Sequence, residues 1–168
     1  MTESDVKKLL RNRYTAPQYA FLTNVANSTG FASRYADGIA FSLWPSSGFQ
    51  IDGFEIKVSR SDLLNELKNP GKCAEILQYC DRWWIVAPKG IVHKDELPKT
   101  WGLLEIVNDK FYTRKPAPQL EKVEGVNLNF VASLLRRATE NVTPNEFLAD
   151  ERKKIRKEAF AEADALVQ

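Results

Sequence analysis

The strongest constraint on the fold of this chain is the alternation of side chains over residues 51–58. Successive side chains of a β-strand point to opposite faces of the sheet. As a strand, this run places two groups of residues on opposite faces, Gly53, Glu55 and Lys57 on one and Phe54, Ile56 and Val58 on the other. The pattern predicts a strand with one apolar face and one face that carries an acid beside a base.

A second strand-like run, residues 34–43, precedes this strand, and the turn sequence Pro-Ser-Ser-Gly at residues 45–48 joins the two. Two such runs with a short turn between them are typical of an antiparallel hairpin. Asp37 and Glu55 then lie at matching ends of the two strands, where their carboxylates can converge. The hairpin therefore predicts a pair of carboxylates with Lys57 beside it.

Helical periodicity and end signals predict the other elements. Pro17 fits the first position of a helix over residues 18–26. Ser59 or Ser61 fits the N-cap of a helix over residues 59–68, which the sequence Asn-Pro-Gly at 69–71 kinks or ends. The remaining expected elements are helices over 5–13, 72–80 and 126–138, a buried strand over 82–87, and an edge hairpin of 101–107 with 110–115.

These elements predict an α/β fold in which helices flank a mixed sheet. The strand over 82–87 should pair in parallel with the strand over 51–58, because a helical crossover connects them. A chain of 168 residues with 43% hydrophobic residues can form one domain with a core. We assign residues 1–140 to this domain. Residues 141–168 extend it with a long charged helix, which is either solvated or bound to a partner.

Composition narrows the setting in which the protein works. The 24 basic and 22 acidic residues give a formal charge of +2, so any contact with nucleic acid must depend on local clusters of charge. The sequence contains no long apolar run and no hydrophobic leader, which predicts neither a membrane span nor a secretory signal. Cys73 and Cys80 are expected to be buried thiols, which favours a reducing, cytoplasmic location.

The carboxylate pair and Lys57 suggest a specific chemistry. Hydrolysis of a phosphodiester needs an activated water and neutralised charge on the phosphate, and a divalent metal held by carboxylates supplies both. Asp37, Glu55 and the backbone carbonyl of Ile56 are the expected ligands of Mg²⁺ or Mn²⁺. Lys57, about 6–7 Å along the strand from Glu55, is placed to stabilise the phosphate charge. The alternative is an ordinary surface ion pair between Glu55 and Lys57, worth about 0–1 kcal/mol.

Four short runs support the catalytic alternative by their order: Ala-Asp at 36–37, Gly-Phe-Glu-Ile-Lys-Val-Ser-Arg-Ser-Asp at 53–62, Tyr-Cys-Asp-Arg-Trp-Trp at 79–84, and Leu-Pro-x-x-Trp-Gly-Leu-Leu at 97–104. Together they resemble the PD-(D/E)XK nuclease superfamily, and more closely its MmcB-like DNA-repair proteins. The resemblance implies a restriction-endonuclease-like mixed sheet flanked by helices. It also implies that Asp37 and Glu55 bind the metal and that Lys57 is catalytic.

The resemblance implies accessory residues as well. Members of the superfamily often carry an acid in the first core helix. The helix predicted over residues 18–26 holds no acid, and Gln18 is its nearest polar candidate. Polar residues of the crossover helix approach the site in this superfamily, which makes Lys72 and Tyr79 candidates, although core packing explains Tyr79 about as well.

Other charged residues near the motif have expected roles of their own. Arg60, Lys68 and Lys72 belong to the crossover segment and are candidate contacts for the phosphates of a nucleic acid. Asp52 is expected on the apolar face of its strand, and Asp62 is expected in the cap of the following helix. Neither aspartate is therefore favoured as a metal ligand.

These observations lead to three functional hypotheses. The first is a metal-dependent deoxyribonuclease of bacterial or phage type that acts in DNA repair or processing. The second is a nuclease-fold module that binds nucleic acid without hydrolysing it, because the helix over 18–26 lacks the expected acid. The third is an assembly factor in which the charged helix after residue 141 contacts a protein partner or a second copy of the chain.

Overall fold

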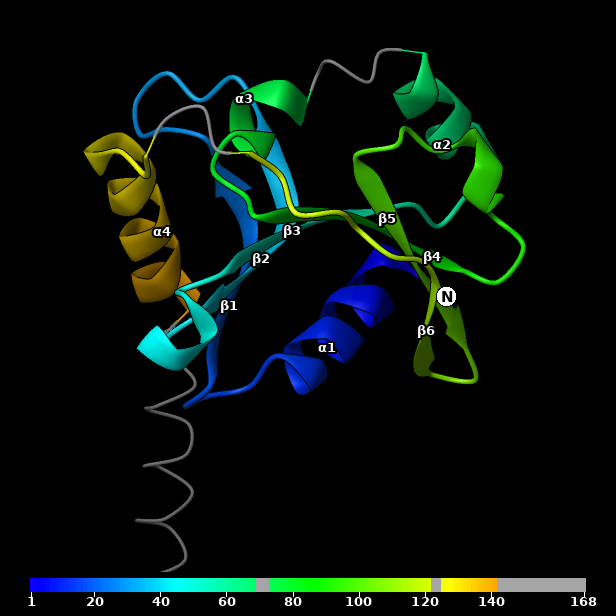
Figure 1. Ribbon diagram of the computed structural model, residues 1–168, viewed down its shortest axis with the longest axis horizontal. Helices are drawn as coiled ribbons and strands as arrows, with labels where there is room; N and C mark the ends of the chain where they lie inside the picture. The colour runs from blue at the N-terminus through cyan, green and yellow to red at the C-terminus, as the bar shows by residue number, and fades with distance from the viewer. Residues whose placement is uncertain (69–72, 122–124, 142–168) are drawn as a thin grey trace, which may run out of the picture. The chain divides into compact units, whose positions relative to one another are not determined.

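The computed structural model describes residues 1–68, 73–121 and 125–141. The chain divides into two compact units, Met1–Arg137 and Ala138–Gln168. The first unit contains a six-stranded sheet whose strands follow the order of the chain, and Figure 1 shows helices on both of its faces. The strands are β1 Tyr19–Ala26, β2 Tyr35–Ser42, β3 Ile51–Ile56, β4 Arg82–Pro88, β5 Trp101–Val107 and β6 Lys110–Lys115.

Four α-helices and two short 3-10 helices accompany the sheet within the described residues. The α-helices are α1 Glu3–Arg13, α2 Arg60–Leu67, α3 Ala74–Leu77 and α4 Leu128–Asn141, and the 3-10 helices are η1 Pro45–Ser47 and η3 Lys94–Glu96. Local signals explain where several of them begin. The Thr2 side chain caps α1 in a capping box with Asp5, and the Ser59 hydroxyl accepts a hydrogen bond from the Asp62 backbone N–H at the start of α2.

The sheet is mixed, as the sequence predicts. Strands β1, β2 and β3 pair antiparallel in succession, and η1 lies in the turn of the predicted hairpin. Strand β4 pairs in parallel with both β3 and β5, and β6 completes an antiparallel edge hairpin. The crossover through α2 and α3 therefore has the parallel geometry expected of it.

The helix predicted over residues 18–26 is wrong, because this segment forms strand β1. It pairs with β2 along its whole length, from Tyr19 opposite Ser42 to Ala26 opposite Tyr35. The segment is rich in aromatic and β-branched residues, which favour strands. Asn24 has a backbone φ of 52° inside the strand. This left-handed residue interrupts the regular alternation and leaves apolar spacings that also fit a helix.

Two other predicted helices have different limits in the structure. Helix α3 covers only Ala74–Leu77 of the expected segment 72–80. Helix α4 begins at Leu128 rather than near residue 126, since the Asn127 side chain accepts a hydrogen bond from the backbone N–H of Phe130 and so caps its first turn. The predicted break at 69–71 and the predicted helix over 145–167 lie outside the described residues.

The apolar face of β3 packs under α1. Phe54 and Ile56 join Val6 and Leu10 of α1 in a buried cluster that also includes residues of β2, β4 and β5. Figure 1 shows α1 on one side of the strands and α2 and α3 on the other. The predicted division of residues 51–58 into an apolar and a polar face is therefore confirmed.

The opposite face of the sheet is covered by the crossover and by α4. Tyr79, which follows α3, stacks on Phe130 of α4 with ring centroids 4.3 Å apart, and its hydroxyl accepts a hydrogen bond from the Asn127 side chain. Cys73 and Cys80 are buried, as predicted. Among the described helices, none is both long enough and apolar enough to cross a membrane.

Candidate functional site

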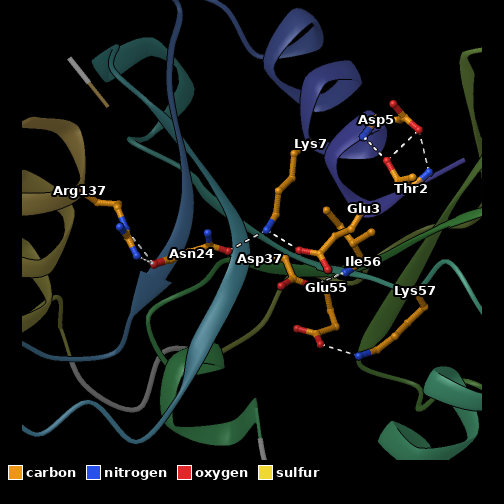
Figure 2. Close-up of polar contacts among 10 residues, drawn as sticks. All are labelled: Thr2, Glu3, Asp5, Lys7, Asn24, Asp37, Glu55, Ile56, Lys57 and Arg137. Carbon is orange, nitrogen blue, oxygen red and sulfur yellow. Dashed lines mark hydrogen bonds and ion pairs between the residues drawn. The ribbon is translucent and has the colours of Figure 1, made fainter. Parts of the chain in front are cut away.

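The antiparallel register of β2 and β3 brings Asp37 and Glu55 together. Gly38 lies opposite Phe54, so the preceding residue of β2 lies next to the following residue of β3. A carboxylate oxygen of Asp37 accepts a hydrogen bond from the Ile56 backbone N–H at 2.8 Å, as Figure 2 shows. Both acids line one surface pocket of about 300 Å³, together with Glu3, Ile56, Lys57, Asp62, Asn65 and Glu66.

Lys57 is fixed at the edge of this pocket by two acids. Its Nζ lies 2.7 Å from Oε1 of Glu55 and 3.3 Å from Oε2 of Glu66. Its backbone N–H donates to the carbonyl of Val86, which anchors the end of β3 to β4. Only 11% of the Lys57 side chain is exposed. Glu66 comes from α2 and did not figure in the sequence-based prediction of the site.

The electrostatics of Glu55 differ from those of a surface acid. Burial and, to a smaller extent, the neighbouring charge of Asp37 raise the pKa of Glu55 to about 7, against the opposing effect of Lys57. An ordinary surface ion pair would lower the pKa of the carboxyl group instead of raising it, because an exposed cation stabilises the ionised acid. The site therefore holds a carboxyl group with a pKa close to neutral pH.

Asp37 and Lys57 are perturbed in the same direction. Burial raises the pKa of Asp37, and the charge of Glu3 adds to this effect, while the hydrogen bond from Ile56 opposes it. Burial disfavours the charged form of the Lys57 ammonium, but the carboxylates of Glu55 and Glu66 outweigh it and raise the pKa of Lys57. The Lys57 ammonium therefore stays protonated at neutral pH, beside the carboxyl groups of Glu55 and Glu66.

Glu3 of α1 belongs to this pocket, and the sequence-based prediction missed it. Its carboxylate lies 2.5 Å from the Nζ of Lys7, which also donates to Oδ1 of Asn24 at 2.7 Å, and Figure 2 shows it beside Asp37. Because residues 19–26 form a strand, the first helix of the fold is α1, and this helix does carry an acid at the site. The capping pair Thr2 and Asp5 is the sequence signal that could have placed Glu3 at the start of α1.

The donors in the pocket suit a hard divalent cation in their chemistry. They are carboxylate oxygens and a backbone carbonyl, the ligands that Mg²⁺ prefers, and a bound cation would relieve the repulsion that raises the pKa of Glu55. Across residues 1–68, 73–121 and 125–141, no three histidine, cysteine or acidic side chains gather closely enough to form a metal cluster. The ligands available for a cation in this pocket are thus two carboxylates, from Asp37 and Glu55, and the backbone carbonyl of Ile56.

The accessory residues expected from the sequence lie elsewhere. Gln18 precedes β1 and its carbonyl accepts from the Leu43 backbone N–H, at the end of the sheet away from Asp37. Tyr79 is packed against Phe130 in the core. Lys68 is exposed and donates to the side chain of Asn65, a residue that lines the pocket. Lys72 lies outside the described residues.

Arg60 does not line the pocket and pairs with an acid of the loop between β4 and β5. Its guanidinium forms a two-pronged ion pair with the carboxylate of Glu96 and also donates to the carbonyl of Ile91 at 3.0 Å. These contacts join the start of α2 to the loop between β4 and β5. Arg60 therefore has a structural partner, and its predicted contact with a phosphate stays a prediction.

Asp52 has a structural role that agrees with its expected place on the apolar face. It is buried, and its two carboxylate oxygens accept hydrogen bonds from Arg82 of β4 at 2.7 and 2.9 Å. Arg82 also donates to the side chain of Gln50 and lies over the ring of Trp84. This bidentate pair ties the start of β3 to β4, and Asp52 does not line the pocket that contains Asp37.

Replacing Asp52 with alanine is expected to lower the free energy of unfolding by about 2–3 kcal/mol, because it leaves a half-buried guanidinium without its carboxylate. Urea unfolding followed by tryptophan fluorescence measures this change. The double variant Asp52→Leu/Arg82→Met removes both charges and should recover part of the loss. A single variant as stable as the wild type would contradict this account of the pair.

Comparison with known proteins adds information on the fold. No family model matches the chain, and neither does any curated protein. Among solved structures, the chain is similar to a protein of unknown function from Silicibacter pomeroyi, with a TM-score of 0.58, a sequence identity of 20% and 88% of each chain covered. This likeness shows a common mixed α/β fold.

Proposed function

We propose that this protein is a metal-dependent nuclease that hydrolyses phosphodiester bonds in DNA, with its active site at the pocket of Asp37, Glu55 and Lys57. The observation that carries the proposal is the meeting of two half-buried carboxylates from neighbouring strands with a lysine in one open pocket. The raised pKa of Glu55 supports it, since shifted pKa values concentrate at functional sites. The resemblance of roughly residues 14–137 to the PD-(D/E)XK superfamily also supports it.

The residues of the pocket have distinct roles in this proposal. Asp37, Glu55 and the Ile56 carbonyl would hold Mg²⁺ or Mn²⁺, and Glu3 adds a further carboxylate to the lining of the same pocket. When bound, the ion supplies neutralisation of phosphate charge and a more acidic water. Lys57 stabilises the negative charge that develops on the phosphate oxygens, and Glu66 holds the Lys57 ammonium in position from the side of α2.

A second candidate function is binding of nucleic acid without hydrolysis. It is favoured by the finding that, within the described residues, no three histidine, cysteine or acidic side chains gather closely enough to hold a metal ion. A site with two close carboxylates binds a divalent ion less tightly than one with more charged ligands. In this case the wild-type protein would bind DNA in a salt-dependent manner and show no turnover on adding Mg²⁺.

A cleavage assay tests the proposal. The wild-type protein is incubated with single-stranded, nicked and duplex DNA, and with RNA of the same sequence, in Mg²⁺, in Mn²⁺ and in EDTA. The variants Asp37→Asn, Glu55→Gln and Lys57→Met are expected to lose about 100-fold or more of the cleavage rate, as is typical when one charge-stabilising group is removed. EDTA should abolish cleavage by the wild type.

The matched control is Glu105→Gln. Glu105 is an acid of β5 that pairs with Arg114 at 2.7 Å and does not line the pocket, so its loss should leave the cleavage rate within about 2-fold of the wild type. Calorimetric titration with Mg²⁺ provides a second readout, in which Asp37→Asn should lose the binding signal. Cleavage that persists unchanged in both Glu55→Gln and Lys57→Met would reject this site.

A further inference from the structure

A second, smaller pocket lies between the end of β1, the loop that follows it and α4. It has a volume of about 140 Å³, close to that of an engineered protein cavity that admits benzene. We call it the Arg136–Arg137 pocket. The residues that line it are Asn24, Ala26, Ser28, Thr29, Gly30, Ala32, Tyr35, Ser133, Arg136 and Arg137.

The chemistry of this lining matches an anion. Two guanidinium groups and four hydroxyl side chains line the pocket, and none of its lining residues is acidic. Gly30 has a φ of +92°, and nothing lies within 4 Å of the position that a side chain would occupy there. A ligand can therefore approach the backbone closely at this point. The planar guanidinium group of arginine matches the geometry of phosphate oxygens and can bind two of them at once.

The pocket is built rather than incidental, because its walls are fixed by hydrogen bonds. Arg137 donates through Nε and Nη2 to the carbonyl of Asn24, at 2.9 and 2.7 Å, as Figure 2 shows. Ser133 donates to the carbonyl of Ala26 at 2.8 Å. These bonds hold α4 against the end of β1 and fix the plane of one guanidinium. Arg136, one residue earlier, is exposed at the pocket.

The Arg136–Arg137 pocket adjoins the candidate active site. Tyr35 lines the Arg136–Arg137 pocket, and Asp37 lines the pocket of the candidate active site. Residues two positions apart in a strand lie about 7 Å apart and point to the same face of the sheet. Asn24 also lines the Arg136–Arg137 pocket, and its side chain accepts from Lys7, which holds Glu3. Figure 2 shows this series of contacts running from Arg137 through Asn24 and Lys7 to the acids of the site.

We propose that the Arg136–Arg137 pocket binds a phosphate group of the nucleic-acid strand that lies at Asp37 and Glu55. This inference rests on the proposed function, because it takes the ligand of the neighbouring pocket to be a polynucleotide. The phosphate is either the terminal phosphate of the strand or a phosphodiester within it, and both present the same anionic oxygens. Two arginines beside the acidic site give the protein the local positive charge that its near-neutral composition lacks.

The experiment measures binding separately from cleavage. Fluorescence anisotropy in EDTA gives the affinity of the full chain for a short single-stranded oligonucleotide over a range of salt concentrations, with a 5′-phosphate and with a 5′-hydroxyl. Arg136→Gln is the test variant, because Arg136 is exposed and its loss spares the bonds of Arg137 to β1. We expect about 3–10-fold weaker binding and a decrease of about 1 in the slope of log affinity against log salt.

The control is Arg114→Gln, which removes an exposed arginine of β6 that pairs with Glu105, outside both pockets. Weaker binding of the 5′-hydroxyl probe by the wild type, but not by Arg136→Gln, would assign the pocket to a terminal phosphate. Equal weakening of both probes by Arg136→Gln would assign it to an internal phosphodiester. Arg136→Gln that matches Arg114→Gln in affinity and salt slope, or a wild type that binds neither probe, would overturn the inference.

The outcomes also separate this inference from the proposed function. If the wild type cleaves DNA in Mg²⁺ while Arg136→Gln binds as tightly as the control, the nuclease proposal stands and the phosphate pocket is rejected. If Arg136→Gln loses affinity and the wild type shows no metal-dependent cleavage, the phosphate pocket stands and hydrolysis is rejected. Each result therefore bears on one proposal without depending on the other.

Discussion

Replacing Gly53 with alanine is expected to lower the free energy of unfolding by about 3 kcal/mol or more, or to prevent folding. A Cβ atom at this position would lie 2.4 Å from two ring atoms of Trp83 and 2.8 Å from the Sγ of Cys80. Trp83 is fully buried and lies opposite Gly53 in the parallel pair of β3 and β4. Overpacking of a rigid core costs about 1–3 kcal/mol and sometimes more, and neither neighbour here is the flexible end of a side chain.

Two comparisons isolate the cause of this loss. Gly125→Ala is the matched control, because no atom lies within 4 Å of its added Cβ, and its stability should stay within about 0.5 kcal/mol of the wild type. Gly53→Ala should cost less in a Trp83→Leu background, where the ring is absent. Urea midpoints and soluble yields measure both effects. Gly53→Ala with the stability of Gly125→Ala would contradict the packing of β3 against Trp83.

The second large effect concerns the pH dependence of stability at Glu55. Burial raises the pKa of Glu55 to about 7 in the folded protein, against an ordinary value of 4.5. Between these values the folded state binds the proton more tightly than the unfolded state, so the free energy of unfolding falls as pH rises. The fall from this group is expected to be on the order of 3 kcal/mol. It is complete above pH 7 and absent below pH 4.5.

Glu55→Gln removes this group from the titration and identifies its contribution. Without divalent metal, the variant should gain stability relative to the wild type as pH rises from 5 to 8, since its amide carries no charge to bury. Adding Mg²⁺ at pH 8 should raise the melting temperature of the wild type, because a ligand that binds the folded state stabilises it. The melting temperature of Glu55→Gln should respond little to Mg²⁺.

Glu105→Gln is the matched control for the metal effect, since it makes the same substitution at an ion-paired acid outside the pocket. Its melting temperature should rise with Mg²⁺ as much as that of the wild type. A difference between wild type and Glu55→Gln that stays constant from pH 5 to 8 would show that Glu55 ionises like a surface acid. Asp37 and Glu55 would then not form a crowded carboxylate pair.

Gly53 and Glu55 show how one strand serves both the fold and the candidate site. On the polar face of β3, Gly53 makes room for Trp83 and Glu55 reaches the pocket. On the other face, Phe54 and Ile56 anchor the strand under α1. The site residues thus lie on a strand that is fixed by core packing on both sides, and such rigid support keeps a catalytic constellation in place.

The sequence alone determined the central hairpin, the parallel strand β4 and the edge hairpin of β5 and β6. These elements carry local signals, namely alternation, turn residues and helix caps, that can be read within a few positions. The pairing of Asp37 with Glu55 followed from the register of a single hairpin. The sequence of β1 resembles a helix because the left-handed Asn24 disturbs its alternation, and only its pairing with β2 reveals its structure.

The remainder of the candidate site was decided by tertiary structure. Glu3 meets Asp37 because α1 packs on the sheet, and Glu66 reaches Lys57 because α2 turns back over the end of β3. Arg137 donates to the carbonyl of Asn24, which lies 113 positions earlier in the sequence. Each of these contacts joins residues that are distant in sequence or on separate elements, so no local pattern encodes it. The sequence therefore determined the strand that carries the candidate site, and packing determined which charges surround it.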